Sequence, residues 1–242
     1  MPERPNLYRG YRFPREVITH AVRLYLRFAL SYRDVEELLA ERGVIVSYET
    51  IRHWVAKFGS HYADELRKRE GRAGRTWHWD EMATRIGGRL HWLWRAVDEH
   101  GQTLDVLLQE HRDTAAAERF LRRLLLATAS ETPPGRITTD KLGSYAAALA
   151  RVPELADVEH LQVRSAQRCN NRVEQAHQPT RLRERVMRRF KSAVSAQRFL
   201  DAFSRVGNLF RPGRHRLTAP AYRAAMRERL AIWREIAGLH AA

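Results

Sequence analysis

The chain has 242 residues, of which 44% are hydrophobic and 29% are charged, a composition typical of a protein with an apolar core. Lys and Arg outnumber Asp and Glu by 43 to 28, which gives a formal net charge of +15. Such a surplus favours a polyanionic partner, and nucleic acid is the commonest one. The single cysteine, Cys169, excludes a disulfide framework and a multi-cysteine zinc site. No apolar run is long enough for a membrane span or a secretory signal, so we expect no membrane partner and a reducing, cytoplasmic setting.

The charge is distributed unevenly along the chain. Residues 1–76 carry a net charge of +5, residues 77–160 carry −3, and residues 161–216 carry +11. A slightly acidic centre between two basic segments indicates carboxylate chemistry enclosed by arms that bind phosphates.

Three short helices are expected between residues 14 and 60. Apolar residues recur at helical spacing from Pro14 to Leu30, and Ser31 with Asp34 has the spacing of a capping box that opens a second helix. Gly43 ends this second helix, and Ser47 caps a third. Two helices joined by a tight turn are typical of a helix-turn-helix that binds DNA, with a small helical packing module as the alternative. The polar face of the third helix would offer DNA five residues, Tyr48, Glu49, Arg52, His53 and Lys57.

The pattern changes to strands after a polar segment at residues 66–76, which we expect to be a linker. Aromatic and alternating residues predict a strand over Trp77–Ile86, a turn at Gly87 and Gly88, and further strands over Leu90–Val97 and Thr103–Leu108. Four tryptophans are expected mainly in the core of this hairpin, with stacking on splayed bases as the alternative: Trp77, Trp79, Trp92 and Trp94.

The remainder of the chain alternates helices with short strands. Helices are expected from residue 113 or 114 to about Leu125, at Tyr145–Ala150 and after residue 170, with short strands at Ile137–Thr139 and near Val158–Leu161. Three strands in a meander, followed by helix, strand, helix, strand and helix, is the element order of a ribonuclease-H-like domain. We therefore predict an α+β (α/β) fold with a helical helix-turn-helix domain at residues 1–65, the linker at 66–76, a mixed-sheet catalytic domain at 77–216 and a helical tail at 217–242.

Three acidic residues stand out by their positions. Asp80 lies inside an aromatic strand, where a lone charge is costly to bury without a partner or a metal. Asp140 ends a short apolar strand, where a side chain faces a cleft, and Glu174 lies on a predicted helix in a strongly basic segment. Carboxylates on three different elements suit two Mg²⁺ ions, which keep water positions for substrate phosphates. Each acid alone would fit a surface salt bridge, but the three together favour a metal site.

Seven stretches carry a resemblance to a known family: Tyr25–Gly43, Tyr48–Val55, Trp77–Met82, Gly87–Asp98, Thr138–Tyr145, Asn170–Thr180 and Met187–Ser192. In order and spacing they are similar to the DDE transposases of bacterial insertion sequence family six, and they cover about residues 10–216. The resemblance implies that Asp80, Asp140 and Glu174 are the catalytic, metal-binding triad. The chain departs from many relatives at Met82, where they have Thr, and at Gln175, where they often have Asn.

The resemblance implies a DNA transposase. Such a protein binds the terminal inverted repeats of an insertion sequence, cleaves with Mg²⁺ (Mn²⁺ can substitute) to expose 3′-OH ends, and transfers those ends directly into target DNA. It also implies double-stranded DNA of the element ends and of the target as partners, a homodimer or larger synaptic complex, and a place at the bacterial nucleoid. Two alternatives are a catalytically silent or domesticated DNA-binding regulator and a structure-specific nuclease of the same fold.

The segment around the third acid offers further polar residues. Asn170, Asn171 and Lys141 are candidates for hydrogen bonds that orient the metal ligands. His177 is a candidate for the same role, and the resemblance suggests that it assists metal or phosphate binding as the alternative. Pro179 is expected to end or kink the helix that carries Glu174. Contacts with DNA phosphates are expected from a dense set of basic residues, Arg172, Arg181, Arg183, Arg185, Arg188, Arg189 and Lys191.

Overall fold

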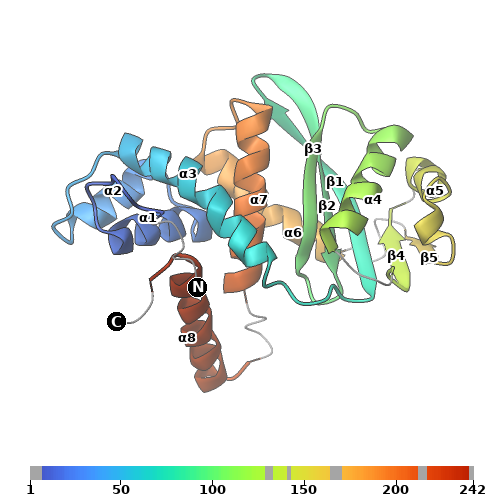
Figure 1. Ribbon diagram of the computed structural model, residues 1–242. Coiled ribbons are helices and arrows are strands. Elements are labelled where there is room, and N and C mark those ends of the chain that lie inside the picture. Colours follow the sequence, from blue (N-terminus) through green and yellow to red (C-terminus); the bar gives the residue numbers. More distant parts are fainter. Residues whose placement is uncertain (1–6, 129–132, 141–142, 164–170, 212–216, 240–242) are drawn as a thin grey trace.

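A mixed sheet of five strands lies at the centre of the structure (Figure 1). The computed structural model describes residues 7–128, 133–140, 143–163, 171–211 and 217–239, without the side chains of residues 171–174. The strands are β1 (Thr76–Ile86), β2 (Arg89–Asp98), β3 (Thr103–Gln109), β4 (Arg136–Thr139) and β5 (Glu159–Gln162). The helices are α1 (Arg15–Arg27), α2 (Tyr32–Ala40), α3 (Tyr48–Arg67), α4 (Thr114–Thr128), α5 (Gly143–Leu149), α6 (Asn171–Val186), α7 (Ala193–Phe210) and α8 (Ala219–Ile236), with a 3-10 turn, η1, at Pro153–Leu155. Within the described residues, no helix combines the length and apolarity needed to cross a membrane.

The strand order in the sheet is β3-β2-β1-β4-β5. Strands β1, β2 and β3 form an antiparallel meander, whereas β4 and β5 add to β1 in parallel. Gly87 and Gly88 make the turn between β1 and β2 with φ angles of 55° and 85°, which glycine adopts without steric cost. The chain therefore has the predicted α+β fold with a ribonuclease-H-like sheet, and helices precede and follow it.

Local sequence signals determine where the N-terminal helices begin and end. The Ser31 hydroxyl accepts the Asp34 N–H at 3.1 Å, and the Asp34 carboxylate accepts the Ser31 N–H at 2.7 Å, so the predicted capping box of α2 is confirmed. Gly43 has a φ of 74° after α2, and the Ser47 hydroxyl accepts the Thr50 N–H at the start of α3. Helix α1 is shorter than expected, because the chain becomes extended directly after it, whereas α3 is longer and runs to Arg67, into the first residues of the expected linker.

Two apolar clusters cover the two faces of the sheet. In the first cluster, the N-terminal helices pack with α7, α8 and the sheet face that carries Met82. In the second, α4 and α5 pack on the opposite face, against Trp77, Trp79 and Trp94. Each of these three indoles is at most 1% exposed, so their assignment to the core is confirmed and stacking on DNA bases is excluded for them here. Trp92 packs partly buried against the second cluster.

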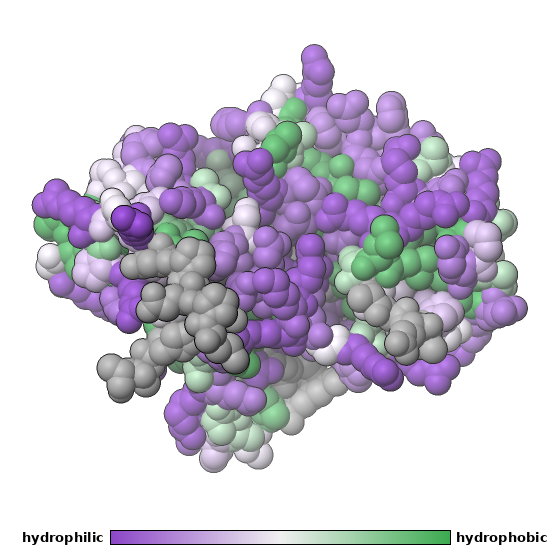
Figure 2. Space-filling view, viewed as in Figure 1, coloured by the Kyte–Doolittle hydropathy of each residue, from purple (hydrophilic) through white to green (hydrophobic). Residues whose placement is uncertain are grey.

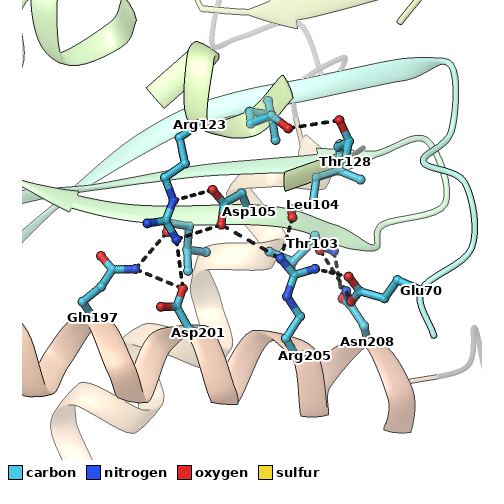
Figure 3. A network of polar contacts seen from close by, with 12 residues as sticks. Glu70, Thr103, Leu104, Asp105, Arg123, Thr128, Gln197, Asp201, Arg205 and Asn208 are labelled. Atoms are coloured by element: carbon cyan, nitrogen blue, oxygen red, sulfur yellow. Dashed lines mark hydrogen bonds and ion pairs between the residues drawn. The ribbon is translucent and has the colours of Figure 1, made fainter. Parts of the chain in front are cut away.

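Helix α7 covers the edge of the sheet at β3 with two side-chain amides (Figure 3). Gln197 accepts the Leu108 N–H at 2.8 Å and donates to the Val106 carbonyl at 3.0 Å. About three helical turns further along α7, Asn208 makes the same pair of bonds with the N–H and the carbonyl of Thr103, at 2.9 and 2.8 Å. Because an unpaired strand edge is a template for pairing with another chain, these amides protect the sheet from association through β3.

The expected linker is bonded to the parts of the chain on both sides of it. Glu70 pairs with Arg205 of α7 and accepts the Asn208 amide at 3.1 Å (Figure 3). Further along, the Arg75 N–H donates to the Glu99 carboxylate at 2.9 Å, at the turn between β2 and β3. Figure 1 shows α6 and α7 between the three N-terminal helices and the sheet. Residues 66–76 therefore connect the two parts through fixed polar contacts.

We expect Gln197→Leu to lower the free energy of unfolding by about 1–3 kcal/mol, because the half-buried Leu108 N–H and the Val106 carbonyl lose their partner. Urea unfolding followed by circular dichroism measures this loss. Arg198→Gln, on the exposed side of the same helix, is the matched control and should change stability by about 0.5 kcal/mol or less. Equal stability of the two variants would show that the amide contacts do not support the edge of the sheet.

Candidate functional site

Two of the predicted acids meet where parallel strands β1 and β4 end their pairing. The register pairs Trp77 with Ile137 and His78 with Thr138, so its continuation by two residues places Asp80 beside Asp140. Both carboxylates remain partly exposed, at 19% for Asp80 and 27% for Asp140. This register explains why acids separated by 60 residues in the sequence lie together at one edge of the sheet.

Glu81 is the third acid of the cluster that the described side chains form, and the sequence prediction did not include it as a ligand. One carboxylate oxygen each of Asp80, Glu81 and Asp140 lies within 4.8 Å of the other two. Burial raises the pKa of Glu81, an effect that Arg112 opposes and Asp140 reinforces. Its Oε2 atom is buried and has no hydrogen-bond partner among the described residues. Three hard oxygen donors with one oxygen still unpartnered fit a divalent cation such as Mg²⁺.

Arg112, in the loop before α4, supplies the positive charge at this cluster. Its Nε donates to Glu81 Oε1, and its guanidinium lies 3.9 Å from Asp140 Oδ2. The same guanidinium lies over the Trp92 ring, 4.9 Å from the ring centroid, which holds it in position. Arg112 is 35% exposed, so it borders both the carboxylates and solvent.

Helix α6 brings the region of the third predicted acid to the same place. His177 Nε2 lies 3.8 Å from Asp80 Oδ2, and Glu174 lies one helical turn before His177. The backbone of α6 thus places Glu174 on the helix that contacts Asp80, while its side chain lies outside the described part of the structure. The position of the Glu174 carboxylate relative to the cluster remains a prediction.

His177 contacts Asp80 as a neutral ring. Burial lowers the pKa of His177 well below its usual range, and Arg95 and Arg181 act in the same direction. The imidazole is therefore neutral at pH 7, and its contact with Asp80 is not an ion pair. Neither ring nitrogen has a hydrogen-bond partner among the described residues. The described residues therefore include no hydrogen bond from His177 to Asp80, and a role of His177 in orienting this ligand stays a prediction.

A buried arginine of β2 fastens α6 to the sheet. Arg95, the cross-strand neighbour of Asp80, donates to the Ala176 carbonyl and to Thr180 Oγ1, the latter at 2.7 Å. These two acceptors lie on either side of Pro179, where a proline predicts that the helix ends or kinks. The helix instead continues to residue 186. The guanidinium thus attaches this part of α6 to β2.

Arg183 was expected to contact DNA, but it lies inside the protein. Its side chain is 1% exposed and donates to the carbonyls of Phe28 and Leu30 at 3.0 and 2.6 Å. The guanidinium also lies over the Tyr25 ring at 4.3 Å and the Phe199 ring at 5.4 Å. Helical periodicity explains the correction, because one side of α6 must face the N-terminal helices. Arg183 thus attaches α6 to the extended chain between α1 and α2.

The expected DNA-contacting face of α3 is largely open. Glu49, Arg52, His53 and Lys57 are exposed, and Tyr48 is half-buried. Arg52 pairs with Glu49 at 2.6 Å, an exposed contact of small energetic value that a phosphate or base could replace.

The remaining predicted residues divide into exposed and undescribed ones. The exposed basic residues are Arg181, Arg185, Arg188, Arg189 and Lys191. Arg181 also approaches Met82 Sδ at 3.3 Å on β1. Lys141 and Asn170 lie outside the described residues, as do the side chains of Asn171 and Arg172.

Comparison with known proteins shows the family to which the chain belongs. Residues 74–213, more than half of the chain, match a family described as a DDE domain, of the IS240 transposase type. The transposase for the insertion sequence-like element IS431mec of Staphylococcus aureus (strain Mu50) is 32% identical over 212 residues, covering 88% of this chain and 92% of that protein. The transposase for insertion sequence element IS257 in transposon Tn4003 of Staphylococcus aureus has the same identity and coverage. The protein belongs to the DDE transposases, a class of polynucleotidyl transferases, and within them to insertion sequence family six.

Two solved structures are similar at lower sequence identity. The Mos1 strand transfer complex contains a chain with a TM-score of 0.43 and 13% identity, covering 95% of this chain and 78% of that chain. The simian T-cell lymphotropic virus intasome in complex with the PP2A regulatory subunit B56 gamma gives a TM-score of 0.37 and 14% identity, over 65% and 57% of the two chains.

We expect Arg112→Ala to increase the affinity of the protein for Mn²⁺ by about tenfold, because the guanidinium competes with a divalent cation for Glu81 and Asp140. Calorimetric titration with Mn²⁺ measures the change. Arg122→Ala, which removes an arginine paired with Glu118 on α4, is the matched control and should leave the affinity unchanged. Weaker binding in Arg112→Ala would mean that Arg112 positions the ligands instead of competing with the cation.

Proposed function

We propose that the protein catalyses Mg²⁺-dependent cleavage at the 3′ ends of its insertion sequence and transfer of those ends into target DNA. The observation that carries the proposal is the cluster of Asp80, Glu81 and Asp140, whose oxygens lie within 4.8 Å of one another in a chain of the DDE family. Asp80, Asp140 and Glu174 would hold two Mg²⁺ ions, with Mn²⁺ able to substitute. When bound, such ions activate the attacking oxygen and stabilise the leaving oxygen of a phosphodiester.

The surrounding residues would prepare the acids for this task. Glu81 anchors Arg112, and Arg112 borders the place where a scissile phosphate would meet the acids. His177 packs neutral against Asp80 and limits the directions in which that carboxylate can turn. Asn170, Asn171 and Lys141 are further candidates for orienting the ligands. The sequence did not predict Arg112 as a residue of this site, because Arg112 lies in a loop whose position no sequence spacing indicates.

Recognition of DNA is proposed for the N-terminal helices. In this proposal, residues 1–65 form the domain that binds the terminal inverted repeats, residues 66–76 connect it to the catalytic domain at 77–216, and residues 217–242 form a helical tail. The exposed residues of α3 support base contacts, and the exposed basic residues after α6 support contacts with phosphates of element ends or target DNA. A homodimer or larger complex would hold two ends together at the nucleoid.

We expect Asp80→Asn, Asp140→Asn and Glu174→Gln each to abolish 3′-end cleavage and strand transfer while DNA binding stays within about twofold, since the affinity comes mainly from basic residues. Cleavage and joining of a labelled end fragment, with a gel-shift titration of the same fragment, measure both. Asp157→Asn, an exposed acid of the same domain, is the control and should retain full activity.

Each outcome of this experiment has a distinct meaning. Activity close to wild type in any of the three variants would remove that residue from the catalytic set. Inactivity of the unmodified protein on its own ends, with binding intact, would contradict the proposal and favour a DNA-binding regulator. Cleavage without preference for the ends and without joining would favour a structure-specific nuclease.

We expect Arg52→Ala to weaken binding to the terminal repeat by ~1–3 kcal/mol, because an arginine on the recognition helix that reads a guanine contributes this much discrimination. Fluorescence anisotropy with a repeat duplex and a scrambled duplex measures the effect. Arg42→Ala, an exposed arginine after α2, is the control and should bind both duplexes as the unmodified protein does. An unchanged affinity for the repeat in Arg52→Ala would assign Arg52 to solvent.

A further inference from the structure

A basic groove of about 840 Å³ runs between the helix-turn-helix and the chain that follows α6. One wall is formed by α2 and the first turns of α3, and the other by residues 186–191 and α7. Six cationic side chains line it, Arg33, Arg52, Arg188, Arg189, Lys191 and Arg198, whereas Glu49 is the one acid among its described lining residues. This charge imbalance favours an anionic occupant.

The second wall is attached to the sheet through backbone contacts. Phe190 is buried, forms a bridge with Ile86, and its carbonyl accepts the Gly87 N–H at 3.3 Å. This attachment holds the basic side chains on either side of Phe190 at the groove, opposite α3. The wall therefore keeps its position relative to the catalytic sheet.

The backbone of this wall is held in an unfavourable conformation. Arg188 and Arg189 have φ angles of 53° and 71°, in the left-handed region that residues other than glycine rarely adopt. Such conformations cost about 1–3 kcal/mol each and persist where the surroundings impose them, often at binding sites. Here they bring two adjacent guanidinium groups to the lining of one groove.

The size of the groove restricts what it can hold. Its volume of about 840 Å³ lies in the range of small-ligand pockets, about 300–1,000 Å³. A single sugar-phosphate strand fits both this volume and the surplus of cations. The first wall also includes Tyr48, Arg52 and His53, which belong to the face of α3 proposed to contact the terminal repeat.

We propose that this groove holds one strand of the terminal-repeat DNA, with α3 on one side and Arg188, Arg189 and Lys191 on the other. The proposal rests on the proposed DNA-binding function and specifies it. The basic residues after α6 are then the second half of the recognition site rather than a separate arm. Because the second wall is attached to β1, binding of this strand also fixes the DNA relative to Asp80 and Asp140.

A double-mutant cycle on the full chain tests the proposal. Arg52→Ala, Arg189→Gln and the double variant are titrated against a duplex carrying the terminal repeat, by anisotropy at constant salt. Residues that contact the same strand are coupled in their effect on affinity. The fold-loss of affinity in the double variant should therefore differ by about threefold or more from the product of the losses in the two single variants. Arg52→Ala combined with Arg227→Gln on the exposed side of α8 is the control and should give the simple product.

A second measurement distinguishes direct contact with DNA from a structural change that a substitution causes in the second wall. A photo-crosslinking amino acid at position 53 and, separately, at position 189 should label the same DNA strand within a few nucleotides. Independent losses in the cycle, or crosslinks to different strands, would overturn the groove proposal and leave the proposed function intact. Absence of affinity for the repeat in the unmodified protein would overturn both.

Discussion

Two buried guanidinium groups hold α6 in place, and the position of the N-terminal helices relative to the acidic cluster depends on them. Arg95 bonds the middle of α6 to the sheet strand next to Asp80, and Arg183 bonds the end of α6 to the chain between α1 and α2. Burial lowers the pKa of both arginines, which shows the cost of taking these charges out of water. Carbonyl acceptors and, for Arg183, the rings of Tyr25 and Phe199 compensate part of that cost, while Arg95 Nε and Arg183 Nε and Nη2 have no hydrogen-bond partner among the described residues.

Helix α7 adds a second connection of a different kind. One side of it belongs to the apolar cluster of the N-terminal helices, and another side supplies Gln197 and Asn208 to the edge of β3. Helix α7 therefore belongs to the core of the N-terminal helices and also covers the edge of the sheet. Together α6 and α7 make it costly for the N-terminal helices to move independently of the sheet. A DNA segment held by α3 would therefore have a fixed position relative to Asp80 and Asp140.

The sequence predicted the features that depend on neighbouring residues. The capping box at Ser31, the turn at Gly43 and the hairpin at Gly87 follow from local chemistry, which acts whatever the rest of the chain does. The pairing of Asp80 with Asp140 was also predictable, because both acids belong to strands of a recognisable order. The family resemblance adds the expectation for Glu174.

Features that depend on distant parts of the chain were not predictable. Arg183 belongs to a run of arginines that look equivalent in the sequence, and only packing against α1 selects it for burial. Glu81 follows Asp80 directly, but alternation along a strand would send it to the opposite face, so its approach to the cluster required the structure. The hydrogen bonds from Arg95 to Ala176 and Thr180 of α6 join residues more than 80 positions apart, so no local pattern indicates them.

If α6 and α7 join the two parts in this way, the N-terminal helices and the sheet unfold as one cooperative unit. Thermal unfolding of the full chain, followed by fluorotryptophan NMR at Trp54 in α3 and Trp79 in β1, tests it most directly. Cooperative unfolding predicts one midpoint for both signals, because the two parts then unfold in a single transition. In Arg183→Met both midpoints should shift to the same lower temperature. Loss of the Trp54 signal at a lower temperature than the Trp79 signal, in the unmodified protein, would contradict it.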